Sequence, residues 1–444
     1  MHQFIIEGGH RLSGTLKAGG NKNAAIKMLP ACLLTDEPII LHNMPDIGDV
    51  RTTIEIMERL GVEIAWEDAH TLRVHAKEIR TTSVDAALAQ KIRASIVLAG
   101  PMLARCGQVT LPVPGGDSIG ERRLDSHVFA LQKLGATINY ENSALVMQAD
   151  GLKGGDILLP EASVTATENA IMASVTAKGT TTIRNVACEP HIQNLCEMLI
   201  KMGAQIEGVG TNRLTIQGVD KLKGCEIRVG ADYMEVGSLI SAAVVTGGEL
   251  LLQDADPQHL DMIALTFERL GVKWEVRGQD IFVPASQSLT IVPDLGNRMP
   301  IIKAQPWPAF PPDLMSIALV IATQSAGSVL FHDWMYESRF FFTDKLVRMG
   351  ARITLCDPHR VLVQGPTALH GVSNITSPDI RAGMAMLLAA LAAKGETRIF
   401  NVQQIDRGYE NVEGKLRALG AQLERVEVDM PTPEEAMETE SAGR

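Results

Sequence analysis

Two kinds of helix-like segment alternate along the chain, and each has its own pattern of apolar positions. In one kind, apolar residues recur every three or four positions, for example at Leu124, Val128 and Leu131, which is the spacing of a helix with one buried face. The other kind, for example residues 237–245, is apolar almost all round, and such helices lie inside a core. Short alternating segments such as residues 213–218 predict strands. The pattern predicts an α/β fold with buried helices.

A short signature closes six of the amphipathic segments. It consists of an apolar residue, a glycine and the start of an apolar strand. The glycines are Gly61, Gly135, Gly203, Gly271, Gly350 and Gly420, at spacings of 74, 68, 68, 79 and 70 residues. Glycine adopts the left-handed conformation that ends many helices, so each copy predicts a helix C-cap. Six copies in register predict one unit of about 70 residues that is repeated six times.

The two ends of the chain indicate how the units are grouped. Residues 3–8 resemble the strand segments 214–218 and 361–365, whereas the last unit ends near residue 425 without a partner strand. Residues 1–20 are therefore expected to complete the C-terminal half. This predicts two domains of three βαβαββ-like units, at 21–230 and at 1–20 plus 231–425, with the candidate site in the cleft between them.

The remaining residues and the overall composition narrow the class of protein. Residues 426–444 are rich in Glu, Pro, Thr and Ser, which predicts an acidic disordered tail.

The formal net charge of −11 argues against a nucleic-acid partner. Six scattered cysteines without a CxxC pair favour reduced thiols over zinc sites or disulfides. We expect a cytoplasmic protein without a signal peptide or membrane partner, because the apolar segment 382–393 is too short to span a bilayer.

Three arginines occupy similar positions in different repeat units. Arg122 and Arg407 each lie 13 residues before a signature glycine, and Arg339 lies 11 before one. A single arginine is usually a solvated surface residue. Three at one structural position, drawn from both predicted domains, favour instead the recognition of carboxylate or phosphate groups.

A second set of charged residues stands at the start of the apolar helices. Lys22 follows a Gly-Gly-Asn turn, which makes a candidate anion site at a helix N-terminus. The simpler alternative is a glycine turn with an exposed lysine. The matching helix starts carry Arg93, Asp313 and Arg381. Charge at the head of a buried helix is costly unless it is paired or functional.

The segment 111–123 is dense in proline and glycine, which predicts a loop and suggests a lid. Asp117 stands at its tip. An aspartate that only forms the turn is the alternative interpretation.

Five motifs resemble those of the enolpyruvyl transferase family, in the branch that uses UDP-N-acetylglucosamine. They lie at residues 22–25, 93–101, 115–120, 310–313 and 405–410, and the resemblance covers residues 1 to about 425. It implies two inside-out α/β domains, with buried helices and outer sheets. It implies an enzyme that moves the enolpyruvyl group of phosphoenolpyruvate to the 3′-hydroxyl of UDP-N-acetylglucosamine, releases phosphate and commits the sugar to peptidoglycan. No metal or organic cofactor is implied.

The resemblance also assigns residues to the two substrates. Lys22, Arg122 and Arg407 would hold phosphoenolpyruvate, with Asn23 beside them and Arg339 and Arg381 helping. Asp313 matches the base that acts on the hydroxyl. The UDP-sugar site would be lined by Arg93, Arg122, Arg123, Leu124, Asp125, Ser126, Ser163, Val164, Asp313 and Met335.

The sequence departs from the family at the lid tip and near the nucleotide. Most members carry Cys where this chain has Asp117. Asp117 would then be the proton donor, and resistance to fosfomycin, which alkylates that Cys, is expected. Pro312, Tyr233 and Glu161 replace other residues of the family pattern.

Two other functions stay open: an enolpyruvyl transferase with another acceptor, and a non-catalytic protein that binds a sugar nucleotide.

Overall fold

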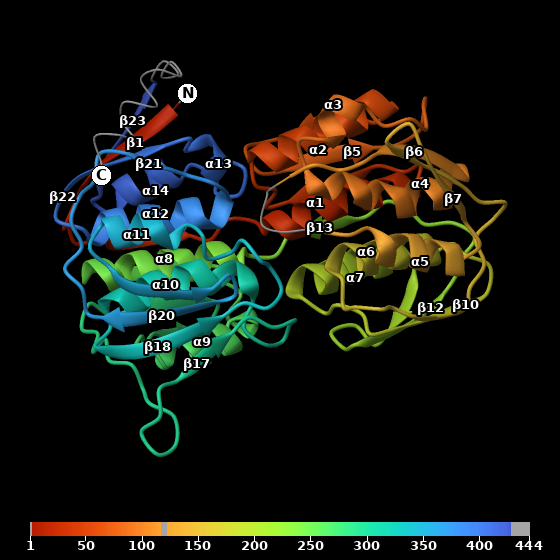
Figure 1. The fold of residues 1–444 in the computed structure, drawn as a ribbon. Helices are drawn as coiled ribbons and strands as arrows, with labels where there is room; N and C mark the ends of the chain where they lie inside the picture. Colours follow the sequence, from red (N-terminus) through yellow and green to blue (C-terminus); the bar gives the residue numbers. More distant parts are fainter. Residues whose placement is uncertain (1, 117–121, 428–444) are drawn as a thin grey trace.

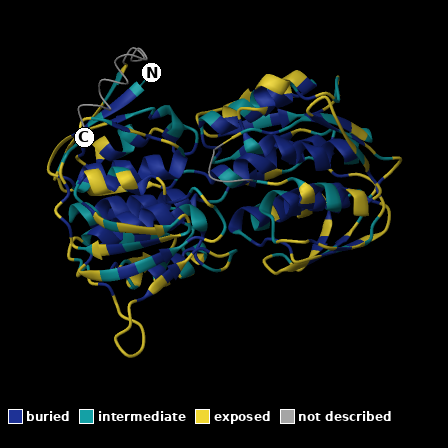
Figure 2. Cartoon of the chain, in the orientation of Figure 1, coloured by how far each residue is buried: buried dark blue, intermediate teal, exposed yellow. Residues whose placement is uncertain are grey.

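A computed structural model describes residues 2–116 and 122–427 of the chain and has two lobes (Figure 1). Each lobe has its own cluster of buried hydrophobic residues. The cluster of the first lobe runs from Ala24 to Val229. That of the second lobe combines Phe4–Ala18 with Ala231–Leu423. The α/β fold with buried helices is confirmed (Figure 2).

Three sheets belong to the first lobe, at the right of Figure 1. In spatial order, the first consists of β13 (Glu226–Arg228), β3 (Ile39–His42), β5 (Leu72–His75) and β4 (Glu63–Trp66). The second consists of β9 (Asp156–Leu158), β10 (Thr180–Arg184), β12 (Arg213–Gln217) and β11 (Gln205–Glu207). The third consists of β6 (Gln108–Pro112), β8 (Ala144–Gln148) and β7 (Thr137–Glu141).

Three four-stranded sheets belong to the second lobe. The first consists of β2 (Ser13–Lys17), β14 (Glu249–Gln253), β16 (Asp280–Val283) and β15 (Glu275–Arg277). The second consists of β17 (Ile301–Lys303), β18 (Gly327–His332), β20 (Arg360–Gly365) and β19 (Arg352–Asp357). The third consists of β21 (Ile375–Thr376), β22 (Gly395–Phe400), β1 (His2–Gly8) and β23 (Gln422–Glu427).

All six sheets follow one plan. In the four-stranded sheets the first strand pairs parallel with the second, and the other pairings are antiparallel. In the remaining sheet, a single parallel bridge between Ser83 and Thr110 stands where the others have their first strand. The repeat in the sequence is therefore a repeat in topology.

The helices fall into an inner and an outer set. The inner helices of the first lobe are α1 (Lys22–Ala31), α4 (Ala99–Cys106), which continues the 3₁₀ turn η2 (Arg93–Leu98), and α6 (Val164–Ser174); those of the second lobe are α8 (Tyr233–Thr246), α10 (Met315–Gln324) and α12 (Ile380–Ala392). Small residues let them approach closely. At Gly100 of α4, for example, a Cβ would lie 2.5 Å from the Asn169 carbonyl oxygen of α6.

The outer helices end at the six signature glycines. They are α2 (Gly48–Leu60), α5 (Asp125–Lys133), α7 (Pro190–Lys201), α9 (Asp261–Glu268), α11 (Thr343–Arg348) and α14 (Val412–Ala418). All six glycines have φ between 86° and 106°, so the predicted left-handed C-caps are confirmed. Short helices and turns complete the described chain: α3 (Ala86–Ala89), α13 (Gln403–Asp406), η1 (Cys32–Leu34), η3 (Pro257–His259) and η4 (Pro312–Leu314).

The chain crosses between the lobes twice, side by side, where Gly20 and Ala231 form an isolated bridge. Strand β2 precedes α1 in sequence but pairs with β14 of the second lobe, and β13 precedes α8 but pairs with β3 of the first. The segment 225–229 thus belongs to the first lobe, although the helix that follows it belongs to the second. We propose that the two lobes are two domains, joined at this crossing.

The C-terminal strand extends slightly further than the sequence pattern predicts. Val426 and Glu427, assigned above to the acidic tail, form the end of β23, beside β1. The rest of that predicted tail lies outside the described residues. Across residues 2–116 and 122–427, no helix is long and apolar enough to cross a membrane.

Candidate active site

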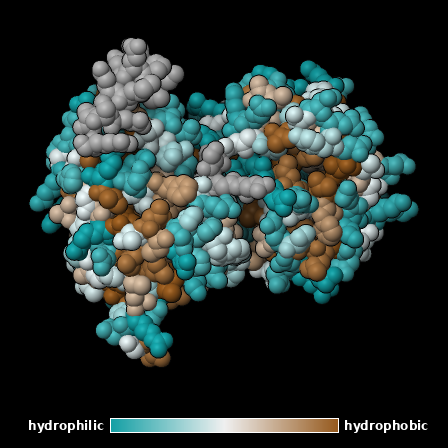
Figure 3. All heavy atoms as spheres, in the orientation of Figure 1, coloured by the Kyte–Doolittle hydropathy of each residue, from teal (hydrophilic) through white to brown (hydrophobic). Residues whose placement is uncertain are grey.

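A cavity of about 220 Å³ lies between the two lobes, and the surface is hollowed there (Figure 3). Its walls come from both lobes. The predicted site residues that line it are Lys22, Asn23, Arg93, Arg122, Val164, Asp313, Arg339, Arg381 and Arg407. Residues up to 385 positions apart in sequence thus meet at one place, as the register of helix starts predicts.

Helix starts bring several of these side chains to the cavity. Lys22 opens α1, whose N-cap Asn21 accepts a hydrogen bond from the Ala24 amide at 3.0 Å. Arg381 is the second residue of α12, and its amide donates to Asp379 Oδ1 at 2.8 Å. Short polar side chains at the N-cap positions hold these helix starts. They fix where the two cations point.

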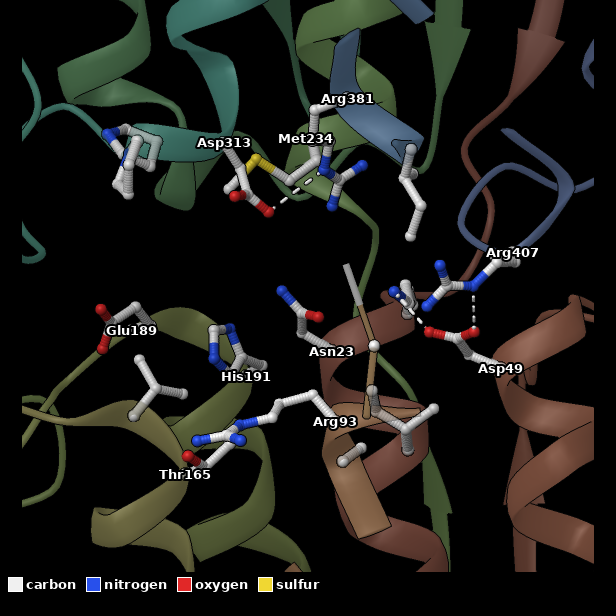
Figure 4. A pocket seen from close by; sticks show the side chains of 18 of the residues that line it. Asn23, Asp49, Arg93, Thr165, Glu189, His191, Met234, Asp313, Arg381 and Arg407 are labelled. Carbon is white, nitrogen blue, oxygen red and sulfur yellow. Dashed lines mark hydrogen bonds and ion pairs between the residues drawn. The ribbon is translucent and has the colours of Figure 1, made fainter. Parts of the chain in front are cut away.

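One corner of the cavity is an ion cluster that joins the two lobes. Asp49 stands at the start of α2, and its Oδ2 atom lies 2.8 Å from Lys22 Nζ. Its Oδ1 accepts a hydrogen bond at 3.0 Å from Arg407 Nε of the second lobe (Figure 4). Burial alone would raise the pKa of Asp49, but Lys22 and Arg407 hold it below its ordinary value. The carboxylate is therefore ionised and keeps both cations on one side of the cavity.

A second corner holds Asp313 between two buried arginines. Arg339 Nη2 and Arg381 Nε each lie 3.1 Å from one of its carboxylate oxygens. Burial would raise the pKa of Asp313, but Arg381 and Arg339 outweigh it and hold the pKa well below the usual range. Arg381 also lies over the Tyr409 ring, 5.3 Å from its centroid. Asp313 is thus an ionised carboxylate whose basicity is suppressed by its partners.

A third group of cations lies on the first-lobe wall. Arg93 donates a hydrogen bond to the carbonyl oxygen of Arg122. Burial and the nearby Arg122 lower the pKa of Arg93 to about 10. Two guanidinium groups this close favour an anion between them.

The predicted stretch from Arg122 to Asp125 lines a neighbouring, wider hollow of about 600 Å³. Arg93 and Arg122 border both hollows. Phe129 and Tyr140 give the wider hollow an apolar, aromatic side. A ligand with an anionic middle and a planar ring at one end fits this arrangement.

Three of the predicted residues that the structure describes line neither hollow. Ser126 donates a hydrogen bond to Glu161 Oε1 at 3.0 Å, and the Met335 amide donates to Asp333 Oδ1 at 2.9 Å. Ser163 immediately precedes α6. These three residues are not among those that line either hollow. Asp117, the predicted acid, lies outside the described residues.

Sequence reasoning missed several residues of the cavity wall, namely Asp49, Thr165, Glu189, His191 and Tyr336. Burial raises the pKa of Glu189 to about 7, since the hydrogen bonds from backbone amides compensate only in part. Two of these residues could have been found from their distance to the signature glycines. Asp49 and His191 each lie 12 residues before a signature glycine, one position from the place of Arg122 and Arg407.

Comparison with known proteins identifies the family. A family model described as EPSP synthase (3-phosphoshikimate 1-carboxyvinyltransferase) matches residues 6–416. A protein of Bradyrhizobium diazoefficiens named UDP-N-acetylglucosamine 1-carboxyvinyltransferase is 52% identical over 424 residues, which cover 96% of this chain and 98% of that protein. The chain belongs to the enolpyruvyl transferase family.

Other enolpyruvyl transferases agree with this assignment. A protein of the same name from Treponema denticola is 51% identical, with 96% of this chain and 99% of that protein covered. The crystal structure of the enolpyruvyl transferase NikO from Streptomyces tendae has a TM-score of 0.85 at 22% identity and covers 96% of this chain and 99% of that one. An EPSP synthase structure from Acinetobacter baumannii has a TM-score of 0.74 at 17% identity. The match covers 96% of this chain and 100% of that one. At these identities the two structures support the fold alone.

Proposed function

We propose that this protein transfers the enolpyruvyl group of phosphoenolpyruvate to the 3′-hydroxyl of UDP-N-acetylglucosamine and releases phosphate. One observation carries the proposal: an ionised Asp313 faces a cavity whose cations come from both lobes. The names of relatives that are about half identical to this chain support the choice of acceptor. Phosphoenolpyruvate carries a carboxylate and a phosphate, which suit separate cation groups.

In this proposal the two corners of the cavity divide the work. Lys22 and Arg407, held by Asp49, bind one anionic end of phosphoenolpyruvate. Arg339 and Arg381 turn toward its other oxygens. Their partial withdrawal from Asp313 raises the pKa of that carboxylate, because opposite charges had lowered it. The base becomes effective only when the donor substrate is bound.

The reaction proceeds by addition and then elimination. Asp313 takes the proton of the hydroxyl, whose oxygen forms a bond to C2 of phosphoenolpyruvate, while an acid adds a proton to the methylene C3. In the second step the bond from C2 to the phosphate oxygen breaks, C3 returns a proton to the acid, and the proton taken by Asp313 leaves with the phosphate. The products are the enolpyruvyl ether and inorganic phosphate, so that atoms and charges balance without a redox cofactor.

Asp117 is the proposed acid for C3, on the resemblance of the lid motif alone. A carboxylate is a poorer nucleophile than a thiolate toward an epoxide, so the enzyme is proposed to resist fosfomycin. The variant Asp117→Cys should stay active and become sensitive in a time-dependent assay. Irreversible inactivation of the unchanged enzyme would contradict this assignment.

We also propose that the protein acts in peptidoglycan synthesis, in the cytoplasm.

Phosphate release from phosphoenolpyruvate tests the proposal directly. The assay compares UDP-N-acetylglucosamine, shikimate 3-phosphate and no acceptor. We expect release with the first acceptor only, and a product mass equal to the sugar nucleotide plus an enolpyruvyl group. Release with shikimate 3-phosphate alone would identify the other acceptor of the family. Binding of UDP-N-acetylglucosamine without release would favour a non-catalytic protein.

A further inference from the structure

His191 is a buried histidine of the cavity wall whose ring is not held by the protein. It is the second residue of α7 and is only 4% exposed. Neither ring nitrogen has a hydrogen-bond partner among the residues that the structure describes. The nearest carboxylate oxygen, Glu168 Oε1, lies 3.9 Å from Nε2, beyond hydrogen-bond distance. A buried polar group in this state is costly, so a functional explanation is needed.

A second histidine of the same lobe shows what a structural histidine looks like here. His127 is equally buried, but its Nε2 lies 3.0 Å from Thr165 Oγ1 and its Nδ1 lies 2.9 Å from Asn169 Nδ2. Both of its ring nitrogens are thus satisfied by the protein. The contrast indicates that the ring of His191 is kept for a partner that enters the cavity.

The surroundings of His191 indicate the kind of partner. Burial and then Lys27 lower its pKa well below the ordinary value, while Asp313 across the cavity acts in the opposite direction. The ring is therefore neutral and offers one donor and one acceptor. Asn23 lies near it on the same side of the cavity (Figure 4). Lys27 and Glu189 also line the cavity, so the imidazole and the Asn23 amide are neutral hydrogen-bonding groups set among charged ones.

The neutral part of the wall lies between charged parts. Arg93 lies below it and the pair of Asp49 and Arg407 to one side (Figure 4). Anionic groups of a ligand should bind at the cations, and its uncharged polar groups should lie between them. A neutral imidazole that both donates and accepts matches a hydroxyl or an amide.

We propose that His191 recognises the sugar of the acceptor by a hydrogen bond to one of its hydroxyl or amide groups. This inference deepens the proposed function and rests on it. The sugar would lie between His191 and Asp313, so that the ring helps to present the reacting hydroxyl to the base. His191 is then a specificity-determining residue, because an acceptor without the matching group would leave the ring unpaired.

Calorimetry with two ligands separates this role from a structural one. Affinities for UDP-N-acetylglucosamine and for UDP are measured on the wild type and on His191→Leu and His191→Phe, two variants that lack both nitrogens. We expect about 10-fold weaker binding of UDP-N-acetylglucosamine, with the affinity for UDP unchanged within about 2-fold. The variant His191→Asn, which restores a donor and an acceptor, should recover part of the loss. The test needs only one of His191→Leu and His191→Phe to be folded, and thermal unfolding checks this.

The matched control uses a second, smaller cavity of about 180 Å³, which His191 also borders. His259 lines that cavity and not the first, and His259→Leu should leave both affinities unchanged. Equal losses for UDP and UDP-N-acetylglucosamine in the His191 variants would overturn the inference, as would no loss at all. If the inference on His191 fails in this way, the proposed function still stands as long as the wild type releases phosphate and binds UDP-N-acetylglucosamine more tightly than UDP. A wild type that binds both ligands equally would overturn both.

Discussion

Two carboxylates that line the cavity, Asp49 and Asp313, are held in similar ways but have different relations to the lobes. Asp49 lies between Lys22 of its own lobe and Arg407 of the other. Asp313 lies between Arg339 and Arg381, both of the second lobe. The first cluster therefore depends on how the lobes meet, whereas the second is built within one lobe. The difference teaches that a relative movement of the lobes would change the first corner but leave the geometry of the second intact.

Removing the carboxylate of the second corner should have the largest effect. Asp313→Asn eliminates the proposed base but keeps the shape of the side chain, so we expect turnover to fall by about 10³-fold. Single-turnover phosphate release measures the change. Binding of UDP-N-acetylglucosamine should stay within a few fold. Asp357→Asn, which alters a surface carboxylate paired with Arg360, is the control. Turnover of Asp313→Asn within a few fold of the wild type would show that another group is the base.

Removing the cation that joins the lobes comes next. Arg407→Ala takes away charge-assisted hydrogen bonds to phosphoenolpyruvate, and kcat/KM for that substrate should fall by about 100-fold. The melting temperature should change little, because Asp49 keeps its contact with Lys22. Arg398→Ala, at an exposed pair with Glu396, is the matched control. A variant that unfolds, or one that keeps normal turnover at limiting phosphoenolpyruvate, would contradict this role.

A third carboxyl, that of Glu189, sharpens the comparison because backbone hydrogen bonds and Lys27 compensate its burial only in part. Glu189 has an ordinary pKa of 4.5, which burial raises to about 7. Between these values the folded state holds a proton that the unfolded state has lost, so stability falls as pH rises through this window. Glu189→Gln removes that loss. By urea denaturation we expect nearly equal stabilities at about pH 4 and a variant that is more stable by about 3 kcal/mol at pH 8. Parallel pH curves for the two proteins would contradict the raised pKa.

The smallest effect is expected from Asp49→Asn. Without the carboxylate, Lys22 and Arg407 repel each other and no longer converge on one spot, which should raise KM for phosphoenolpyruvate about 10-fold with a smaller change in kcat. Asp46→Asn, at a more exposed aspartate paired with Arg51, controls for the loss of a charge nearby. A fall in kcat as large as that of Asp313→Asn would show that the two corners do not differ as described.

The repeat unit was readable from the sequence because its signals are local. A glycine with positive φ, an amphipathic helix before it and an apolar strand after it need only neighbouring residues. The same register places charged residues at helix starts, which explains why Lys22, Arg93, Arg381 and Arg407 could be predicted to lie near one another. Asp49 and His191 lie close to the same register, but the signal in the sequence is a recurring arginine, and neither residue is one.

Placement of the nucleotide-side residues could be predicted only in part. The stretch 122–125 lines the wider hollow beside the cavity, but Ser126 and Met335 contact Glu161 and Asp333 instead. The contact of Ser126 with Glu161 joins residues 35 positions apart and depends on how the loops fold back. That of Met335 with Asp333 is a local turn between residues two positions apart.

The sequence by itself determined the sixfold unit, its buried and outer helices, and the family to which the chain belongs. Tertiary structure alone decided that Asp49 meets Arg407 across 358 positions. It also decided which carboxyl groups are acidic. Asp313 and Glu189 are both half-buried in the cavity wall, yet one pKa falls and the other rises. The physical reason is that a pKa depends on the charges around a buried group in space, and only the packing of the two lobes brings those charges together.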